Sequence, residues 1–264
     1  MKIGVCGYIK GKNADGNEFN FLAEAKRAGF DYVELPLSTL AGLSEEEYAS
    51  VRLRVQDSGI PCEACNVFFP GTLRLTGLDV DRRKTRAYLD MSLERAAGVG
   101  SQVVVFGSAG ARNVPESFPL AQGWMQLYDM LGMAGPIAAM HGITIAIEPL
   151  NQAESNIIQT ASEGFTLSKL VDHPNVQLLV DYYHMAHDGE DCGIIRTAAA
   201  RVKHAHFADP QGRVYPSERK ANFDDFFSAL KDAGYTGRVS LEAGYQEFAR
   251  QAPVAQGIMR ELAR

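Results

Sequence analysis

Four ionisable residues end short apolar runs in the second half of the chain: Glu148, Asp181, His206 and Glu242. Such residues are rarely placed at the end of a buried strand unless something pairs them. Three carboxylates brought together repel one another and raise each other's pKa values, unless a divalent cation neutralises them. Taken alone, each residue is explained as well by a capped or salt-bridged position in a strand as by a functional role. Because four occur in succession, we interpret them as ligands of one divalent metal.

The donor types restrict which metal this site would hold. One imidazole and three carboxylates form a set rich in hard oxygen donors, which suits Mn²⁺, Mg²⁺ or Co²⁺ better than a metal that prefers thiolates, with Zn²⁺ a further candidate. His206 is nearer the end of its run than His204, so we expect His206 to be the ligand and His204 a deeper, hydrogen-bonded residue. His184 follows Asp181 by three positions and is expected to face the same pocket.

Eight short runs rich in Val and Ile alternate with longer segments of helical periodicity, as expected for parallel strands that are buried on both faces. Ser44 to Glu47 and Thr160 to Glu163 match the capping box that begins a helix. Gly29, Gly59, Gly98 and Gly234 occupy places where a left-handed residue commonly ends one. The expected strands are 2–6, 32–35, 61–66, 102–106, 143–148, 176–181, 202–207 and 239–242.

This alternation predicts an α/β fold, a single (β/α)₈ TIM barrel spanning residues 1–264. An open doubly wound sheet is the competing architecture, but it would usually show a glycine-rich phosphate turn after its first strand, and Val5-Cys6-Gly7-Tyr8 is not one. In a barrel, reactive groups lie at the carboxyl ends of the strands. Side-chain alternation along 143–148 directs Glu148 into the barrel mouth, on the same face as Thr144 and Ala146.

Composition excludes several classes of protein. A hydrophobic share of 46% and a formal charge of −6 are ordinary for a globular chain and disfavour a nucleic-acid partner. No apolar stretch is long enough for a membrane span, and the first residues do not resemble a signal peptide. Four scattered cysteines suit reduced thiols in a cytoplasm. The pair Cys62 and Cys65 has redox or zinc spacing, but it has no second pair and falls in a strand-like run.

Several segments carry a family resemblance, which is specific from about residue 143 to 246 and rests on overall layout before that. They resemble the xylose isomerase-like sugar isomerase/epimerase superfamily, and most closely its ketose 3-epimerase and hydroxypyruvate isomerase branches. The matching segments are Ile147-Glu148-Pro149-Leu150-Asn151 with Glu154, Asp181-Tyr182-Tyr183-His184, His204-Ala205-His206, Arg213 and Leu241-Glu242.

The resemblance implies a role for each matching residue. Glu148, Asp181, His206 and Glu242 would bind one metal, usually Mn²⁺. Glu148 and Glu242 would also exchange a proton with a ketose through a cis-enediolate. The substrate would be held by Glu154, His184 and Arg213. Glu34 and Asn66 also end strands, but the motif does not fix their roles.

Other functions remain open from the sequence. An aldose–ketose isomerase of the hydroxypyruvate isomerase type or an inosose dehydratase-like enzyme would use the same metal chemistry. Endonuclease IV shares the framework, but it needs histidines after strands three and four that this chain lacks, and a non-enzymatic sugar-binding barrel would need no pair of acid/base glutamates. Relatives are often dimers or tetramers, so a homodimer or homotetramer is expected.

Overall fold

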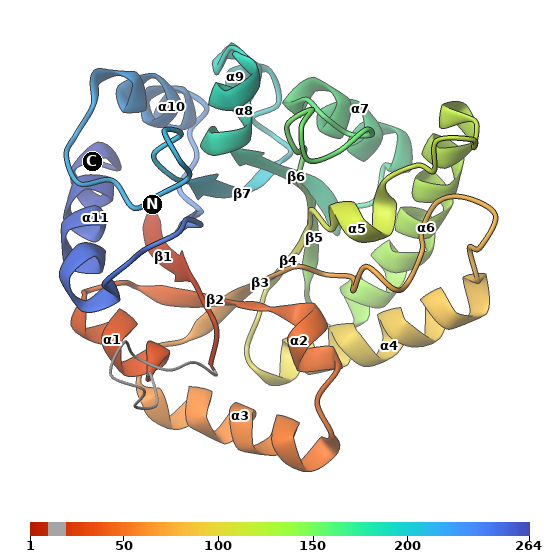
Figure 1. Ribbon diagram of the computed structural model, residues 1–264, viewed down its shortest axis with the longest axis horizontal. Helices are drawn as coiled ribbons and strands as arrows, with labels where there is room; N and C mark the ends of the chain where they lie inside the picture. Colours follow the sequence, from red (N-terminus) through yellow and green to blue (C-terminus); the bar gives the residue numbers. More distant parts are fainter. Residues whose placement is uncertain (10–19) are drawn as a thin grey trace.

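The computed structural model describes residues 1–9 and 20–264 and contains a closed barrel of eight parallel strands, β1 to β8 in chain order, surrounded by helices (Figure 1). The predicted TIM barrel and all eight predicted strands are confirmed. Glu148 and Glu242 lie one residue beyond their strands rather than inside them. The strands are β1 (Lys2–Cys6), β2 (Tyr32–Pro36), β3 (Cys62–Asn66), β4 (Val103–Phe106), β5 (Thr144–Ile147), β6 (Val176–Asp181), β7 (Val202–Phe207) and β8 (Arg238–Leu241).

The helices connect consecutive strands around the outside of the barrel. The short helices α2 and α5 each share a connection with a longer helix, and the connection between β6 and β7 contains the two short helices α8 and α9. The helices are α1 (Phe21–Arg27), α2 (Leu37–Ala41), α3 (Glu45–Ser58), α4 (Arg82–Gly98), α5 (Ala109–Arg112), α6 (Leu120–Met140), α7 (Ala161–Val171), α8 (Tyr182–Asp188), α9 (Gly193–Thr197), α10 (Ala221–Asp232) and α11 (Phe248–Leu262).

The predicted helix ends are mostly confirmed, with two corrections. Ser44 forms the full capping box at the start of α3. Thr160 accepts from the backbone of Glu163, but the Glu163 carboxylate turns back to the N–H of Gln159 rather than to Thr160 itself. Gly98 is the last residue of α4, and Gly100 has the positive φ of 96° because the chain reverses two residues later than predicted.

Two apolar layers hold the barrel together. One lies between strands and helices and includes Ile145 and Ile147 of β5. The other fills the barrel and includes Ala146, so the predicted alternation along this strand is confirmed. The interior layer comprises Tyr32, Ala64, Val103, Val105, Ala146 and Leu179. This packing leaves the carboxyl ends of the strands as the place where polar side chains can gather.

Ion pairs close the opposite end of the barrel. Glu63 near the start of β3 accepts from Lys2 Nζ of β1 and Arg238 Nε of β8, each at 2.6 Å.

Cys62 and Cys65 are buried in β3 as free thiols. No helix in the described ranges is long and apolar enough to cross a membrane.

Candidate metal centre and active site

The four predicted metal ligands come together at the carboxyl ends of β5 to β8. Asp181 of β6 pairs in register with His206 of β7. Glu148 and Glu242 continue their strands by one residue, since their N–H groups donate to Phe106 and Phe207. One ligand atom from each of the four residues lies within 4.8 Å of the others. The order and register of four neighbouring strands therefore bring together the residues that the sequence analysis singled out.

His206 is at the centre of this group and is fully buried. Its Nδ1 lies 3.2 Å from Glu148 Oε1 and 3.4 Å from Glu242 Oε2. An imidazole lone pair and carboxylate oxygens are all acceptors, so this arrangement is stable only with a positive species among them. A proton or a metal ion meets that requirement.

Unpartnered polar atoms at the same place fit a divalent cation. Oδ2 of Asp181 is buried and has no hydrogen-bond partner within the described ranges, and the same is true of Nε2 of His184. The two atoms lie 3.6 Å apart. Buried polar atoms are normally satisfied, so an orphaned carboxylate oxygen beside three other ligand atoms is what a metal site requires. The residues present therefore fit the metal that the resemblance implies.

The electrostatics of the group separate its two glutamates. Burial and the charge of Glu242 raise the pKa of Glu148, although His206 opposes them. Burial acts the same way on Glu242, but His206 and Arg213 outweigh it and hold its pKa well below the ordinary value. For His206, burial opposes a charge, yet Glu34 and Glu242 hold the pKa well above its usual range. The site thus moves the pKa values of its two glutamates in opposite directions.

Arg213 connects the metal group to the predicted substrate residues. Its guanidinium donates to Glu242 Oε2 at 2.6 Å, lies 3.4 Å from Glu154 Oε2 and stacks over the Tyr183 ring. Its φ of 51° lies in the region that glycine favours, and the Gly244 N–H fixes the loop by donating to its carbonyl. Glu154 and Arg213 are partly exposed, whereas His184 is buried.

Three further residues orient these groups: Asn66 and Asn151, which the sequence analysis named without a role, and Arg112, which it missed. Asn151 Nδ2 lies within hydrogen-bond distance of both His184 Nδ1 (2.9 Å) and Glu154 Oε1 (3.1 Å). Asn66 Nδ2 donates to Glu242 Oε1 at 2.9 Å. Arg112 is fully buried and donates to the carbonyls of Phe106 and Glu148. Asn151 and Asn66 stand at identifiable motif and strand-end positions, whereas nothing in the sequence around Arg112 indicates its burial.

A second group of possible ligands, Cys6, Glu34 and His206, shares the same histidine. It fits a metal less well, because both oxygens of Glu34 already accept hydrogen bonds and burial with the Glu34 charge raises the pKa of the Cys6 thiol. Across the described ranges, the groups of three or more candidate ligands are these two. Further ligands of the kind that endonuclease IV needs do not gather there.

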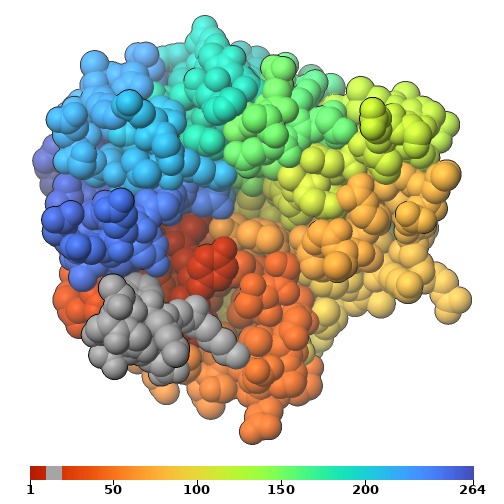
Figure 2. All heavy atoms as spheres, in the orientation of Figure 1, coloured from red at the N-terminus to blue at the C-terminus, as the bar shows by residue number. Residues whose placement is uncertain are grey.

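The surface over the ring of strands is hollowed near its centre (Figure 2). A separate groove of about 960 Å³ lies between α4 and α6, lined by residues such as Arg86, Tyr128 and Met140. None of the candidate catalytic residues lines that groove. The chemistry therefore assigns the site to the barrel mouth rather than to this groove.

Residues 22–262 match the model of a protein family described as xylose isomerase-like TIM barrel. The chain belongs to this family. D-psicose 3-epimerase of Agrobacterium fabrum is 26% identical over 84% of this chain and 78% of its own. A putative hydroxypyruvate isomerase of Streptomyces coelicolor is 27% identical over 83% of each chain. The family assignment agrees with the predicted resemblance.

Solved structures agree on the architecture of this xylose isomerase-like barrel. The structure of D-psicose 3-epimerase with D-tagatose from Clostridium cellulolyticum H10 superposes with a TM-score of 0.84 at 21% identity, covering 100% of this chain and 99% of the other. At that identity the likeness establishes the fold. Several of the curated relatives are ketose 3-epimerases, so a sugar epimerase or isomerase fits this xylose isomerase-like chain.

Proposed function

We propose that the protein is a ketose 3-epimerase that depends on a divalent metal and transfers a proton between Glu148 and Glu242. The observation that carries this proposal is the convergence of Glu148 and Glu242 on His206 Nδ1, at 3.2 Å and 3.4 Å, within one group of candidate ligands; the pKa values of the two glutamates move in opposite directions. Two titratable groups whose environments separate their pKa values are the usual mark of an acid and a base in one site. The ketose epimerase relatives support the same reaction class.

Glu242 is the carboxylate that Arg213 and Asn66 hold ionised, so it is the proposed base that removes the hydrogen from C3. Glu148 is buried beside it, and its raised pKa suits a group that returns a proton. When the two carboxyl groups act on opposite faces of one carbon, the product is the epimer. The reverse reaction exchanges their roles.

Glu148, Asp181, His206 and Glu242 would hold the metal, and Mn²⁺ suits their oxygen-rich donor set. A bound divalent cation supplies positive charge where negative charge develops on the oxygen next to the breaking C–H bond. Burial of Glu148, Asp181 and His206 excludes water from their side of the site, which strengthens each charge interaction there. A metal ion free in water would neither orient a substrate nor exclude water from it.

Glu154, His184 and Arg213 are the proposed substrate-binding residues. Glu154 and Arg213 are exposed enough to meet a ligand, and His184 offers an unpartnered Nε2 toward the metal group. Together they present hydrogen-bond donors and an acceptor, which suits the hydroxyl and carbonyl oxygens of a ketose.

The experiment incubates the Mn²⁺-loaded protein with free ketoses in D₂O. The expected result is a C3 epimer that carries deuterium at C3. Formation of an aldose with deuterium at the neighbouring carbon would instead indicate aldose–ketose isomerisation. This reaction is the second candidate, and the hydroxypyruvate isomerase relative favours it. Loss of water from the substrate would indicate the dehydratase chemistry, and absence of exchange with every ketose would exclude both isomerase functions.

A further inference from the structure

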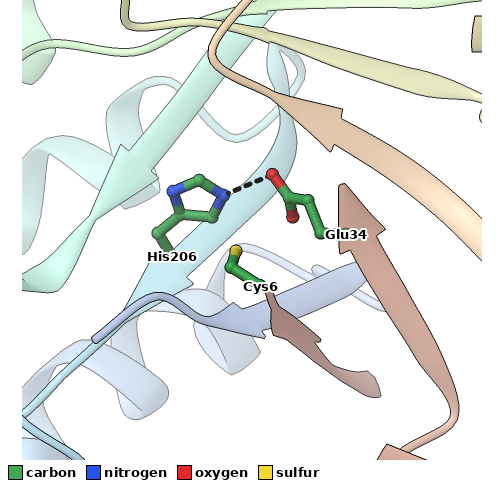
Figure 3. Close-up of side chains that lie close together, drawn as sticks. All are labelled: Cys6, Glu34 and His206. Carbon is green, nitrogen blue, oxygen red and sulfur yellow. Dashed lines mark hydrogen bonds and ion pairs between the residues drawn. The ribbon is translucent and has the colours of Figure 1, made fainter. Parts of the chain in front are cut away.

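A buried glutamate lies on the far side of the His206 ring from the metal group. Glu34 is fully buried at the level of the last residue of β1, and its strand β2 does not neighbour β7 in the barrel. Its Oε1 lies 3.0 Å from His206 Nε2. Figure 3 shows the two side chains pointing toward each other from opposite strands, with Cys6 beside them.

We propose that Glu34 is a positioning residue for the metal centre, because its carboxylate accepts from Nε2–H of His206 and so turns Nδ1 toward Glu148, Asp181 and Glu242. The inference rests on the proposed metal-dependent function. An imidazole that donates through one nitrogen offers only the other as a ligand. The 3.2 Å and 3.4 Å distances from Nδ1 to Glu148 and Glu242 place that nitrogen on the metal side.

Glu34 is itself held in place by two further side chains, His204 and Ser240. His204 Nε2 lies 2.8 Å and Ser240 Oγ 2.5 Å from its Oε2, and the Ser240 hydroxyl lies 2.7 Å from the hydroxyl of Tyr32. All of these side chains are fully buried. A buried carboxylate is costly unless it is fully hydrogen-bonded, so this arrangement is specific rather than incidental. It also assigns His204, the histidine that does not reach the metal group, to the support of Glu34.

Only a carboxylate fits between the two histidines. Each imidazole presents Nε2 to a different oxygen of Glu34, so two acceptors are needed. An amide has one oxygen and one NH₂ group. In Glu34→Gln one histidine therefore faces a donor and must rotate or exchange the nitrogen that carries its hydrogen, and in either orientation of the amide His206 loses the charged acceptor that holds its ring.

The experiment measures Mn²⁺ binding by titration calorimetry for the parental protein and for Glu34→Gln. We expect the variant to bind Mn²⁺ about 10- to 100-fold more weakly, which is the usual effect of losing a residue that orients a metal ligand. The matched control is Glu63→Gln, which also removes a carboxylate from ion pairs in the barrel, but at its opposite end. The control should bind Mn²⁺ within about twofold of the parental protein, a result that a general effect of weakened folding would not give.

An unchanged Mn²⁺ affinity in folded Glu34→Gln would overturn the proposal. If that variant does not fold, nitrogen NMR of the parental protein with the diamagnetic ion Mg²⁺ decides instead, and a metal-dependent shift at His206 Nε2 rather than Nδ1 would overturn it. Failure of the proposed function has a different signature. In that case the parental protein binds Mn²⁺ and the Glu34→Gln substitution weakens this binding, yet no ketose exchanges hydrogen at C3.

Discussion

At the scale of single residues, the site is a cluster of acceptors that needs a positive charge. Nδ1 of His206 faces two carboxylates, and Asp181 Oδ2 has no hydrogen-bond partner in the described part of the chain. The residue types and their strand-end positions were readable from the sequence, because a run of apolar residues that ends in an ionisable one is conspicuous. The hydrogen bonds that orient them were not.

Replacing either proposed acid/base residue tests the reaction directly. Glu148→Gln and Glu242→Gln should each lower the turnover of a ketose by about 10²- to 10⁴-fold, since an amide neither takes nor returns the proton. Deuterium uptake at C3 from D₂O measures the proton transfer itself. Circular dichroism serves as the control for folding, and a near-parental exchange rate in either variant removes that residue from the acid/base pair.

Metal affinity should rise with pH. His206 has a pKa held well above its usual range in the metal-free protein, so a metal must displace a proton from Nδ1. Below that raised pKa, the dissociation constant for Mn²⁺ should fall about tenfold for each unit of pH. Calorimetry in two buffers of different ionisation enthalpy counts the released protons, and release of none would contradict this account of His206.

At the scale of elements, several strands deliver polar side chains to the mouth, such as Glu34 from β2 and Asn66 from β3, and the helices cover the outside of the barrel. The interior layer from Tyr32 to Leu179 prevents the polar groups from extending deeper on most strands. Closure of the barrel depends on β1, which pairs with both β2 and β8. The contacts that hold β1 therefore matter for every residue of the site.

Asp31 anchors β1 to α11. Its carboxylate accepts from the N–H of Ile3 and from Arg260, and these bonds lower its pKa although burial acts against them. Asp31→Asn should destabilise the fold by about 1–2 kcal/mol at neutral pH. Because the pKa of Asp31 is lower in the folded protein than in the unfolded chain, its carboxylate stabilises the fold at pH values above the unfolded pKa of about 4. This contribution is lost as the pH falls through the pKa of the folded state.

Denaturant unfolding of the parental protein and Asp31→Asn at pH 7 and near pH 3 measures this difference, which should shrink in acid. Asp232→Asn is the matched control, because Asp232 pairs with Arg196 at the surface and both side chains are about half exposed. That exposed pair should contribute less than about 1 kcal/mol. Equal effects of the two substitutions at pH 7 would remove the special role of Asp31.

At the scale of the whole molecule, the barrel brings together residues that are far apart in the sequence, so the metal should stabilise the fold as a unit. Mn²⁺ at about 100 times its dissociation constant should add about 2.7 kcal/mol to the stability. For a chain of this size that corresponds to a rise in melting temperature of several degrees. EDTA should reverse it.

His206→Ala removes the central ligand and should abolish most of that thermal shift. The comparison variant is His204→Ala, which keeps the metal ligands and should retain part of the shift through an undisturbed Nδ1 of His206. If His206→Ala keeps the full shift and metal content, His204 is the ligand instead, contrary to the geometry of β7. The expected homodimer or homotetramer stays a prediction, which sedimentation can test.

The sequence by itself determined the order of strands and helices and the residues that end the strands, because local periodicity and strand-end position are local properties of a chain. The inward direction of Glu148 followed from side-chain alternation in the same way. Gly98 was assigned wrongly, because the exact residue at which a helix reverses depends on how the following strand is placed.

Only the tertiary structure decided which nitrogen of His206 faces the metal group and what holds it there. Glu34 and His206 are 172 residues apart and belong to strands that are not neighbours. Their meeting depends on the closure of the barrel and on the reach of both side chains across its interior. Neither leaves a pattern in the local sequence, so the physical cause of the orientation appears only when the barrel is closed.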